Sequence, residues 1–162
     1  MLDTGELSVK GVLQRARAAL RARLPDEDHE RAPRPDSLRE RRLVRRFADA
    51  VESGDIDEMV ALLTDDARLT MPPLPLEYQG HDAIGAFLRH REEVRGRSLR
   101  VVPTRANTQP AFGCYLPDTQ TAIARAHALF VLTLEGEQVS AITWFGDNSV
   151  FPHFGLPRTL GG

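Results

Sequence analysis

Cysteine and long apolar stretches are scarce in this chain of 162 residues, and each scarcity excludes a class of protein. Because Cys114 is the single cysteine, neither an intramolecular disulfide nor a cysteine-based metal cluster can form. No apolar run approaches the roughly 20 residues that a membrane-spanning helix needs. The formal net charge of −2 gives no overall attraction to nucleic acid or to a lipid surface. We therefore expect a cytoplasmic protein without a membrane partner.

Motifs for common cofactors are missing as well. The sequence contains no glycine-rich phosphate loop, no nucleophile elbow and no dinucleotide fingerprint. His81 and His90 lie at opposite ends of one predicted helix, and the histidines have no spacing typical of a metal site. We expect neither a cofactor nor a metal ion.

The first third of the chain is rich in arginine and divides into two segments. Residues 8–24 have the apolar spacing of a basic amphipathic helix, which Pro25 would end. Residues 25–36 are rich in proline and charge and have no periodicity, so they indicate a linker. We expect a basic helical segment at 1–24, a linker at 25–36 and a domain at 37–162.

The predicted domain begins with helices. A capping box at 37–40 opens a helix that ends at Gly54. Residues 55–58 repeat the start signal for a short helix. A further helix begins at Gly80 and ends near Gly96.

Strand patterns make up most of the remainder. A first strand, at 67–71, is expected before the last helix. Four later segments also have strand character: 99–104, 107–115, 121–134 and 138–145. The Glu135–Gly136 pair between the last two indicates a tight hairpin. This order predicts an α+β domain, in which a curved antiparallel sheet wraps around the N-terminal helices and encloses a cavity.

The helical opening resembles a known family. Residues 46–63, together with the strand and the helix start at Gly80, look like the SnoaL-like family. That family shares its cone fold with ketosteroid isomerase and nuclear transport factor two. The resemblance implies a cone with a pocket between helices and sheet, and a homodimer formed through the outer face of the sheet.

A closer resemblance is to the C-terminal SnoaL-like domain of actinobacterial extracytoplasmic-function sigma factors. It rests on residues 71–80, 109–112 and 154–157, and residues 8–20 resemble the end of sigma region 4. Region 2 and the first helix of the helix-turn-helix have no counterpart here, so a recognition helix would lack its scaffold. We expect no sigma-factor activity and no DNA binding, and the chain to be either a stand-alone relative or a fragment with an inherited leader.

Two positions argue against ketosteroid isomerase chemistry. The resemblance places Met71 where those enzymes carry their general-base aspartate, and Phe47 where they carry the oxyanion tyrosine. Neither side chain can transfer a proton. We expect both to pack in the core or to line an apolar pocket.

Other residues are candidates for the ligand pocket. Tyr78 belongs to a proline-stiffened crossing and can hydrogen-bond a ligand at the cavity mouth. Trp144 shares a strand face with Ile142, and the family match points this face into the cavity. Asn107 and Gln109 are expected on one strand face, where their amides can orient a ligand. The predicted pocket contains Phe47, Met71, Tyr78, Asn107, Gln109 and Trp144.

Catalysis would need a different proton-transfer set. His127 titrates near neutral pH, although its strand alternation does not settle which face it occupies. Asp147 follows the last strand and can pair with it. Together with Tyr78 these are the catalytic candidates, and each has a plainer alternative as a packed or solvated side chain.

Two main functions stay open from the sequence. The first is a SnoaL-like module that binds a small apolar molecule, or a partner such as RNA polymerase or a sigma-related protein, in a regulatory role. The second is a SnoaL-like enzyme, namely a polyketide-type cyclase, an isomerase or an epoxide-opening catalyst, that uses acid–base chemistry in the cone pocket. A truncated gene product without an independent role is a third reading.

Overall fold

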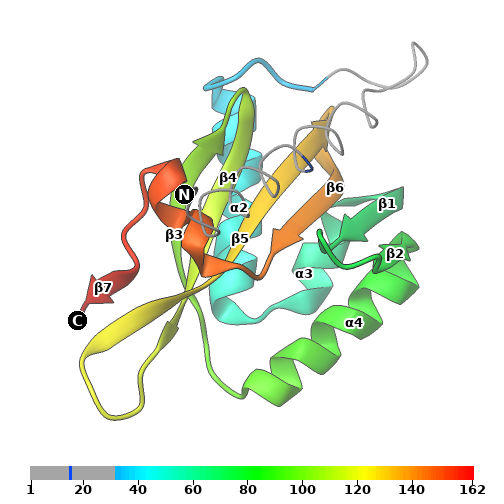
Figure 1. The fold of residues 1–162 in the computed structure, drawn as a ribbon. Helices are drawn as coiled ribbons and strands as arrows, with labels where there is room; N and C mark the ends of the chain where they lie inside the picture. Colours follow the sequence, from blue (N-terminus) through cyan, green and yellow to red (C-terminus); the bar gives the residue numbers. More distant parts are fainter. Residues whose placement is uncertain (1–14, 16–31) are drawn as a thin grey trace, which may run out of the picture.

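The computed structural model describes Arg15 and residues 32–162 (Figure 1). The basic helix expected at 8–24, apart from Arg15, and the linker up to residue 31 lie outside the described residues. Within the described part, no helix has the length and apolar character to cross a membrane.

Three of the expected helices are present and begin and end where local signals predict. They are α2 (Leu38–Ser53), α3 (Ile56–Ala61) and α4 (Gly80–Arg95). The Ser37 hydroxyl accepts a hydrogen bond of 3.2 Å from the backbone N–H of Glu40, and Asp55 caps α3 in the same way. Gly54 and Gly96 end α2 and α4 with φ angles of 69° and 62°, a left-handed conformation that glycine adopts without strain.

One sheet of seven strands forms the framework. Its strands are β1 (Leu63–Thr70), β2 (Glu77–Gln79), β3 (Arg100–Ala106), β4 (Gln109–Pro117), β5 (Ile123–Glu135), β6 (Gln138–Phe145) and β7 (Thr159–Gly161). The strand order is β2-β1-β6-β5-β4-β3, and β7 pairs with β5. The pair β1–β6 is parallel, which corrects the expectation of a wholly antiparallel sheet. No hairpin constrains this pair, because an entire helix and four strands separate its members in sequence.

The differences from the expected strands are local. The strand expected at 107–115 begins only at Gln109, because Asn107 has a φ angle of 59° and occupies the β3–β4 turn. Asparagine tolerates this left-handed conformation better than most residues. The short elements β2, β7 and the 3₁₀ helix η1 (Asn148–Phe154) were not predicted.

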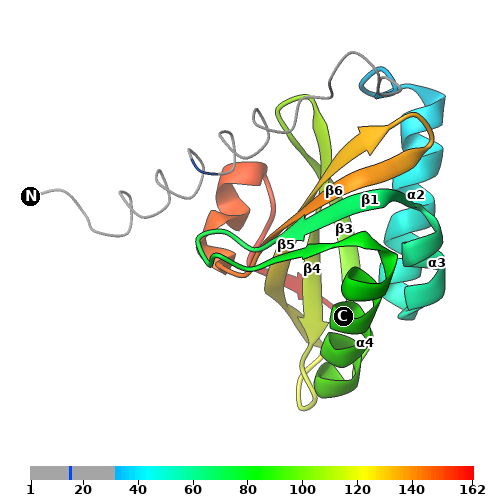
Figure 2. The same ribbon diagram turned by 90° about the vertical axis from the view of Figure 1, so that its right-hand side faces the viewer.

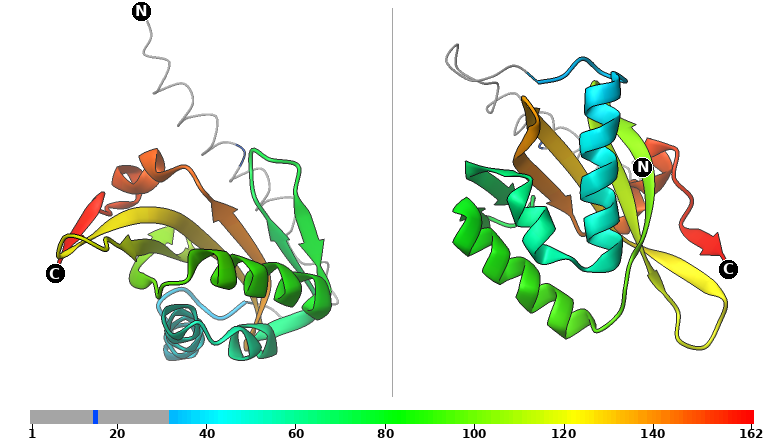
Figure 3. Two further views of the ribbon diagram at one scale, coloured as in Figure 1. Left: turned by 90° about the horizontal axis from the view of Figure 1, so that it is seen from below. Right: turned by 180° about the vertical axis from the view of Figure 1, so that it is seen from behind.

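The sheet separates two hydrophobic clusters. Helices α2, α3 and α4 cover one face, and η1 lies on the other (Figures 2 and 3). The helix-side cluster includes Phe47, Phe112 and Trp144, whereas the opposite cluster includes Tyr115 and Phe151. As predicted, Trp144 shares the helix-side face with Ile142.

Candidate functional site

A continuous row of aromatic rings fills the helix side of the sheet. At its deep end, Phe47 of α2 lies 6.0 Å from Phe112, and Phe112 lies 5.3 Å from Phe130, measured between ring centroids. Phe47 and Phe112 are completely buried. Phe47 therefore acts as a packing residue between α2 and the sheet, which is one of the two roles expected for it.

The outer end of the row is less buried. The rings of Phe130 and Trp144 are 4.8 Å apart, and Phe87 of α4 approaches Trp144 edge-on at 5.7 Å. Tyr78 then stacks on Phe87 at 4.4 Å. Tyr78, Phe87 and Met71 are only half-buried, so an apolar surface is accessible between α4 and the β1–β2 hairpin. Three of the predicted pocket residues, Met71, Tyr78 and Trp144, belong to this region.

A β-bulge decides where His127 lies. Cys114 pairs with Ala128 and Tyr115 with Ala126, so His127 is the extra residue on β5. Ala126 packs with the cluster beneath η1 and Ala128 with the helix-side cluster. His127 is half-buried, and arginines of α4 are close enough to act on it electrostatically.

The environment of His127 favours the neutral imidazole. Burial contributes most, and the positive charges of Arg91, Arg95 and Arg97 add to it, so that the pKa of His127 is lowered from its ordinary value of 6.5. The sequence could not show this, because the arginines and the histidine are 30 or more residues apart in the chain.

The three catalytic candidates lie in different places. Asp147 is exposed at the start of η1, where its Oδ1 accepts a hydrogen bond of 2.9 Å from the backbone N–H of Ser149. Tyr78 stacks on Phe87 at the β2 edge of the sheet, and β1 and β6 separate this edge from β5, which carries His127. No hydrogen bond or ion pair joins His127, Asp147 and Tyr78 in the described part of the chain.

The two amide residues of the predicted pocket do not reach the aromatic row. Asn107 is exposed in the β3–β4 turn, so it does not share a strand face with Gln109. Gln109 donates a hydrogen bond of 3.2 Å from Nε2 to Oγ1 of Thr133. It lies on the same face as Ala111 and Tyr115, which pack beneath η1. The expectation that both amides line the helix-side pocket is therefore not met by their positions.

Two arginines of this site escaped the sequence analysis. Arg91 and Arg95 continue the stripe of α4 that carries Ile84 and Leu88, because residues 84, 88, 91 and 95 fall on one side of a helix. The guanidinium carbon of Arg91 lies 5.4 Å from the centroid of the Trp144 ring. The helical spacing was a usable signal, since arginines on an apolar stripe are unusual.

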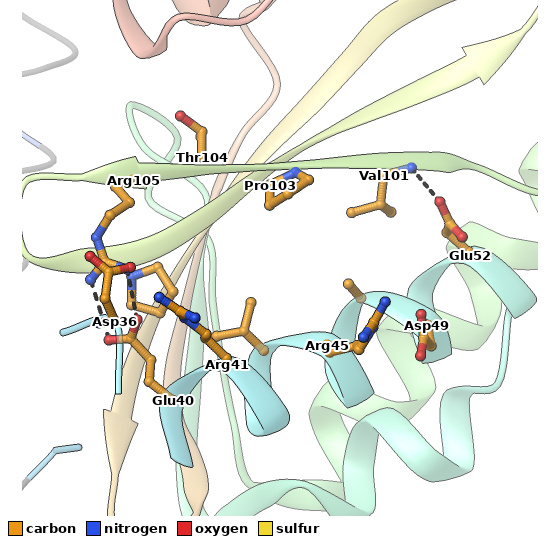
Figure 4. Close-up of a pocket in the computed structure, with 13 residues that line it drawn as sticks. Asp36, Glu40, Arg41, Arg45, Asp49, Glu52, Val101, Pro103, Thr104 and Arg105 are labelled. Atoms are coloured by element: carbon orange, nitrogen blue, oxygen red, sulfur yellow. Dashed lines mark hydrogen bonds and ion pairs between the residues drawn. The ribbon is translucent and has the colours of Figure 1, made fainter. Parts of the chain in front are cut away.

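A separate cavity of about 590 Å³ lies between α2 and β3 (Figure 4). Its lining is Asp36, Glu40, Arg41, Val44, Arg45, Ala48, Asp49, Glu52, Val101, Pro103, Thr104, Arg105 and Pro110. None of the predicted pocket residues is among them. This cavity is a groove with an apolar floor and a charged rim, in the size range of small-molecule sites.

Polar contacts tie both ends of this groove (Figure 4). At one end, Arg105 donates to Glu40 Oε1 at 2.7 Å, and the Glu40 side chain is only 4% exposed. At the other end, the backbone N–H of Val101 donates to Glu52 Oε1 at 2.7 Å. β3 is an edge strand, and Glu52 and the missing N–H of Pro103 remove donors that another strand would need.

The fold and the helix-side site define the class of protein: an α+β cone in which helices cover one face of a mostly antiparallel sheet. The chain belongs to the SnoaL-like family, because the model of the SnoaL-like domain matches residues 44–146. The resemblance inferred from the sequence is thereby confirmed.

Known proteins agree with this assignment. The chain is 33% identical over 160 residues to the ECF RNA polymerase sigma factor SigG of Mycobacterium tuberculosis. This match covers 98% of the chain but 42% of SigG, so the chain spans less than half the length of that relative.

Solved structures share the fold at low identity. A ketosteroid-isomerase-like protein from Kribbella flavida superposes with a TM-score of 0.50 and 22% identity, covering 70% of this chain and 81% of that one. An NTF-2 like protein from Burkholderia xenovorans gives a TM-score of 0.52 and 15% identity, covering 65% and 80%. These likenesses establish the cone architecture alone.

Proposed function

We propose that this chain is a ligand-binding module related to sigma factors, and that it holds a small, largely apolar molecule against Tyr78, Phe87 and Trp144. The observation that carries the proposal is the outer end of the aromatic row, where the half-buried rings of Tyr78 on β2 and Phe87 on α4 meet beside the buried ring of Trp144 on β6. Partly exposed aromatic side chains that converge from several elements are typical of small-molecule sites.

Binding is favoured over catalysis by what surrounds His127. The acid–base mechanism suggested by the sequence would bring His127 together with Asp147 or Tyr78 at one site, since proton-transfer groups must lie within hydrogen-bond reach of the reacting atoms. Asp147 caps η1 and Tyr78 is stacked on Phe87, so neither of these residues joins His127 at such a site. The cyclase or isomerase function therefore has the weaker support of the two.

The regulatory part of the proposal rests on the relationship to SigG. That relative is an RNA polymerase sigma factor by name. We propose that ligand binding to the SnoaL-like domain alters a contact with RNA polymerase or a sigma-related protein. A homodimer formed by the sheet is part of the same proposal.

Mass spectrometry of the purified protein tests the ligand directly. Spectra under native and denaturing conditions should differ by the mass of a small molecule, and lipophilic probes should raise the melting temperature. Phe87→Ala should abolish the effect, whereas Val44→Trp, which fills the α2–β3 groove, should leave it intact. If Val44→Trp abolishes binding and Phe87→Ala does not, the ligand occupies the groove and the aromatic site is wrong. If no probe binds at all, the proposed function fails.

A further inference from the structure

The aromatic site has a strongly positive border. Arg91, Arg95 and Arg97, with the imidazole of His127, form what we call the basic cluster. Arg91 and Arg95 come from the inner stripe of α4, Arg97 from the segment after it, and His127 from the β5 bulge. The Arg95 side chain is only 11% exposed, which is unusual for an arginine.

Contacts within the protein satisfy only part of this charge. Arg95 forms an ion pair with Glu92 and donates from Nε to the carbonyl oxygen of Arg97 at 2.6 Å. Arg97 donates to the carbonyl oxygen of Pro117 at 2.9 Å. Among residues 32–162, Arg91 has a cation–π contact with Trp144 and no recorded carboxylate partner.

The site therefore combines an apolar wall with an excess of positive charge. Arg95 is paired with Glu92, whereas Arg91 is held directly against the aromatic wall and has no carboxylate partner among residues 32–162. A half-buried arginine without a carboxylate is a donor for a ligand oxygen, and its planar fork matches a carboxylate.

We propose that the ligand is an apolar acid: Arg91, supported by Arg95 and His127, binds its carboxylate while its hydrocarbon body lies against Trp144 and Phe87. This inference rests on the proposed function and specifies the chemical class of the ligand. The apolar wall and the cation act on different parts of the same molecule, so a neutral analogue keeps the first contact and loses the second.

The charged groups that act on His127 and its neighbours bear on the pH dependence of binding, and Glu52 of α2 acts on Cys114 among them. α4 contributes Arg91, Arg95 and the partner of Arg95, Glu92, and Arg97 follows that helix. On β4, burial raises the pKa of the Cys114 thiol, so that group stays neutral. A bound carboxylate introduces a negative charge that favours protonated His127, so affinity must rise as the pH falls toward 6. Each unit by which the ligand raises the pKa of His127 strengthens binding by up to about tenfold.

Calorimetry with two matched probes tests the proposal. We expect 2-naphthoate to bind the full chain at least about tenfold more tightly than neutral 2-naphthylmethanol, given the strength of charge-assisted hydrogen bonds. Arg91→Gln should remove this preference while 2-naphthylmethanol affinity changes less than twofold. The control is Arg89→Gln on the same helix. Arg89 forms an ion pair of 2.7 Å with Asp57, and this pair is not part of the aromatic row.

The unmodified protein supplies an independent measurement. Between pH 8 and pH 6, where the probe stays ionised, naphthoate affinity should increase and naphthylmethanol affinity should not. This arm holds even if Arg91→Gln does not fold. Equal affinity for the two probes at every pH would refute carboxylate recognition and leave the proposed apolar site standing. Binding of neither probe would overturn both.

Discussion

Phe112→Ala is the most severe test of the aromatic packing between α2 and the sheet. Phe112 is completely buried on β4 and contacts Phe47 on α2 and Phe130 on β5 through their rings. Removing a buried phenylalanine ring costs about 3–5 kcal/mol of unfolding free energy, because burial is lost and a cavity remains. That is a large share of the roughly 5–15 kcal/mol by which a domain is stable.

Urea denaturation followed by circular dichroism measures this loss. With a slope of about 2 kcal/mol per molar urea, a loss of 4 kcal/mol lowers the midpoint by about 2 M. Phe154→Ala is the matched control, because that ring is half-buried on η1, and we expect a loss below about 1.5 kcal/mol. A loss at Phe112 no larger than at Phe154 would show that the deep end of the cone is not packed as described.

Three further predictions concern caps, charges and pH. Ser37→Ala should cost about 1 kcal/mol in the same assay because α2 loses its N-cap hydrogen bond, and Ser37→Asp should not. Arg105→Gln should cost about 2 kcal/mol, since the nearly buried Glu40 loses its ion pair, and adding Glu40→Gln should recover part of that loss. Unfolding free energy should fall as pH drops below about 6.5, because the unfolded chain protonates His127 before the folded protein does. His127→Gln should flatten that part of a stability–pH profile, and an unchanged profile would contradict the lowered pKa.

Local signals made much of the fold predictable. The caps at Ser37 and Asp55, and the glycines at 54 and 96, act within a single turn, so one sequence contains all their partners. β6 has the bounds predicted for it for the same reason, because the hairpin turn at Gly136 fixes its start.

Non-local contacts set the limit of prediction. The parallel pairing of β1 with β6 joins the edges of these strands that are left unpaired once β1 has paired with β2 and β6 with β5. No local residue pattern encodes it. The side on which His127 lies depends on one extra residue in β5 relative to β4, which is visible only in the pairing. Arg91 was predictable in principle from its helical phase, whereas its position over Trp144 was not.

The parallel pair has a consequence for how this protein is made. Leu63 pairs with Val139, and Leu69 with Ile142, so partners lie about 75 residues apart in the chain. A ribosome releases β1 long before β6 exists, and during that interval β2 is the only strand among those described that can pair with β1. Pairing of strands that are so distant in sequence is slow, and hydrophobic surface that is prone to aggregation stays exposed until it occurs. We expect nascent chains that stop before residue 138 to need chaperones, and synthesis of β6 to trigger folding.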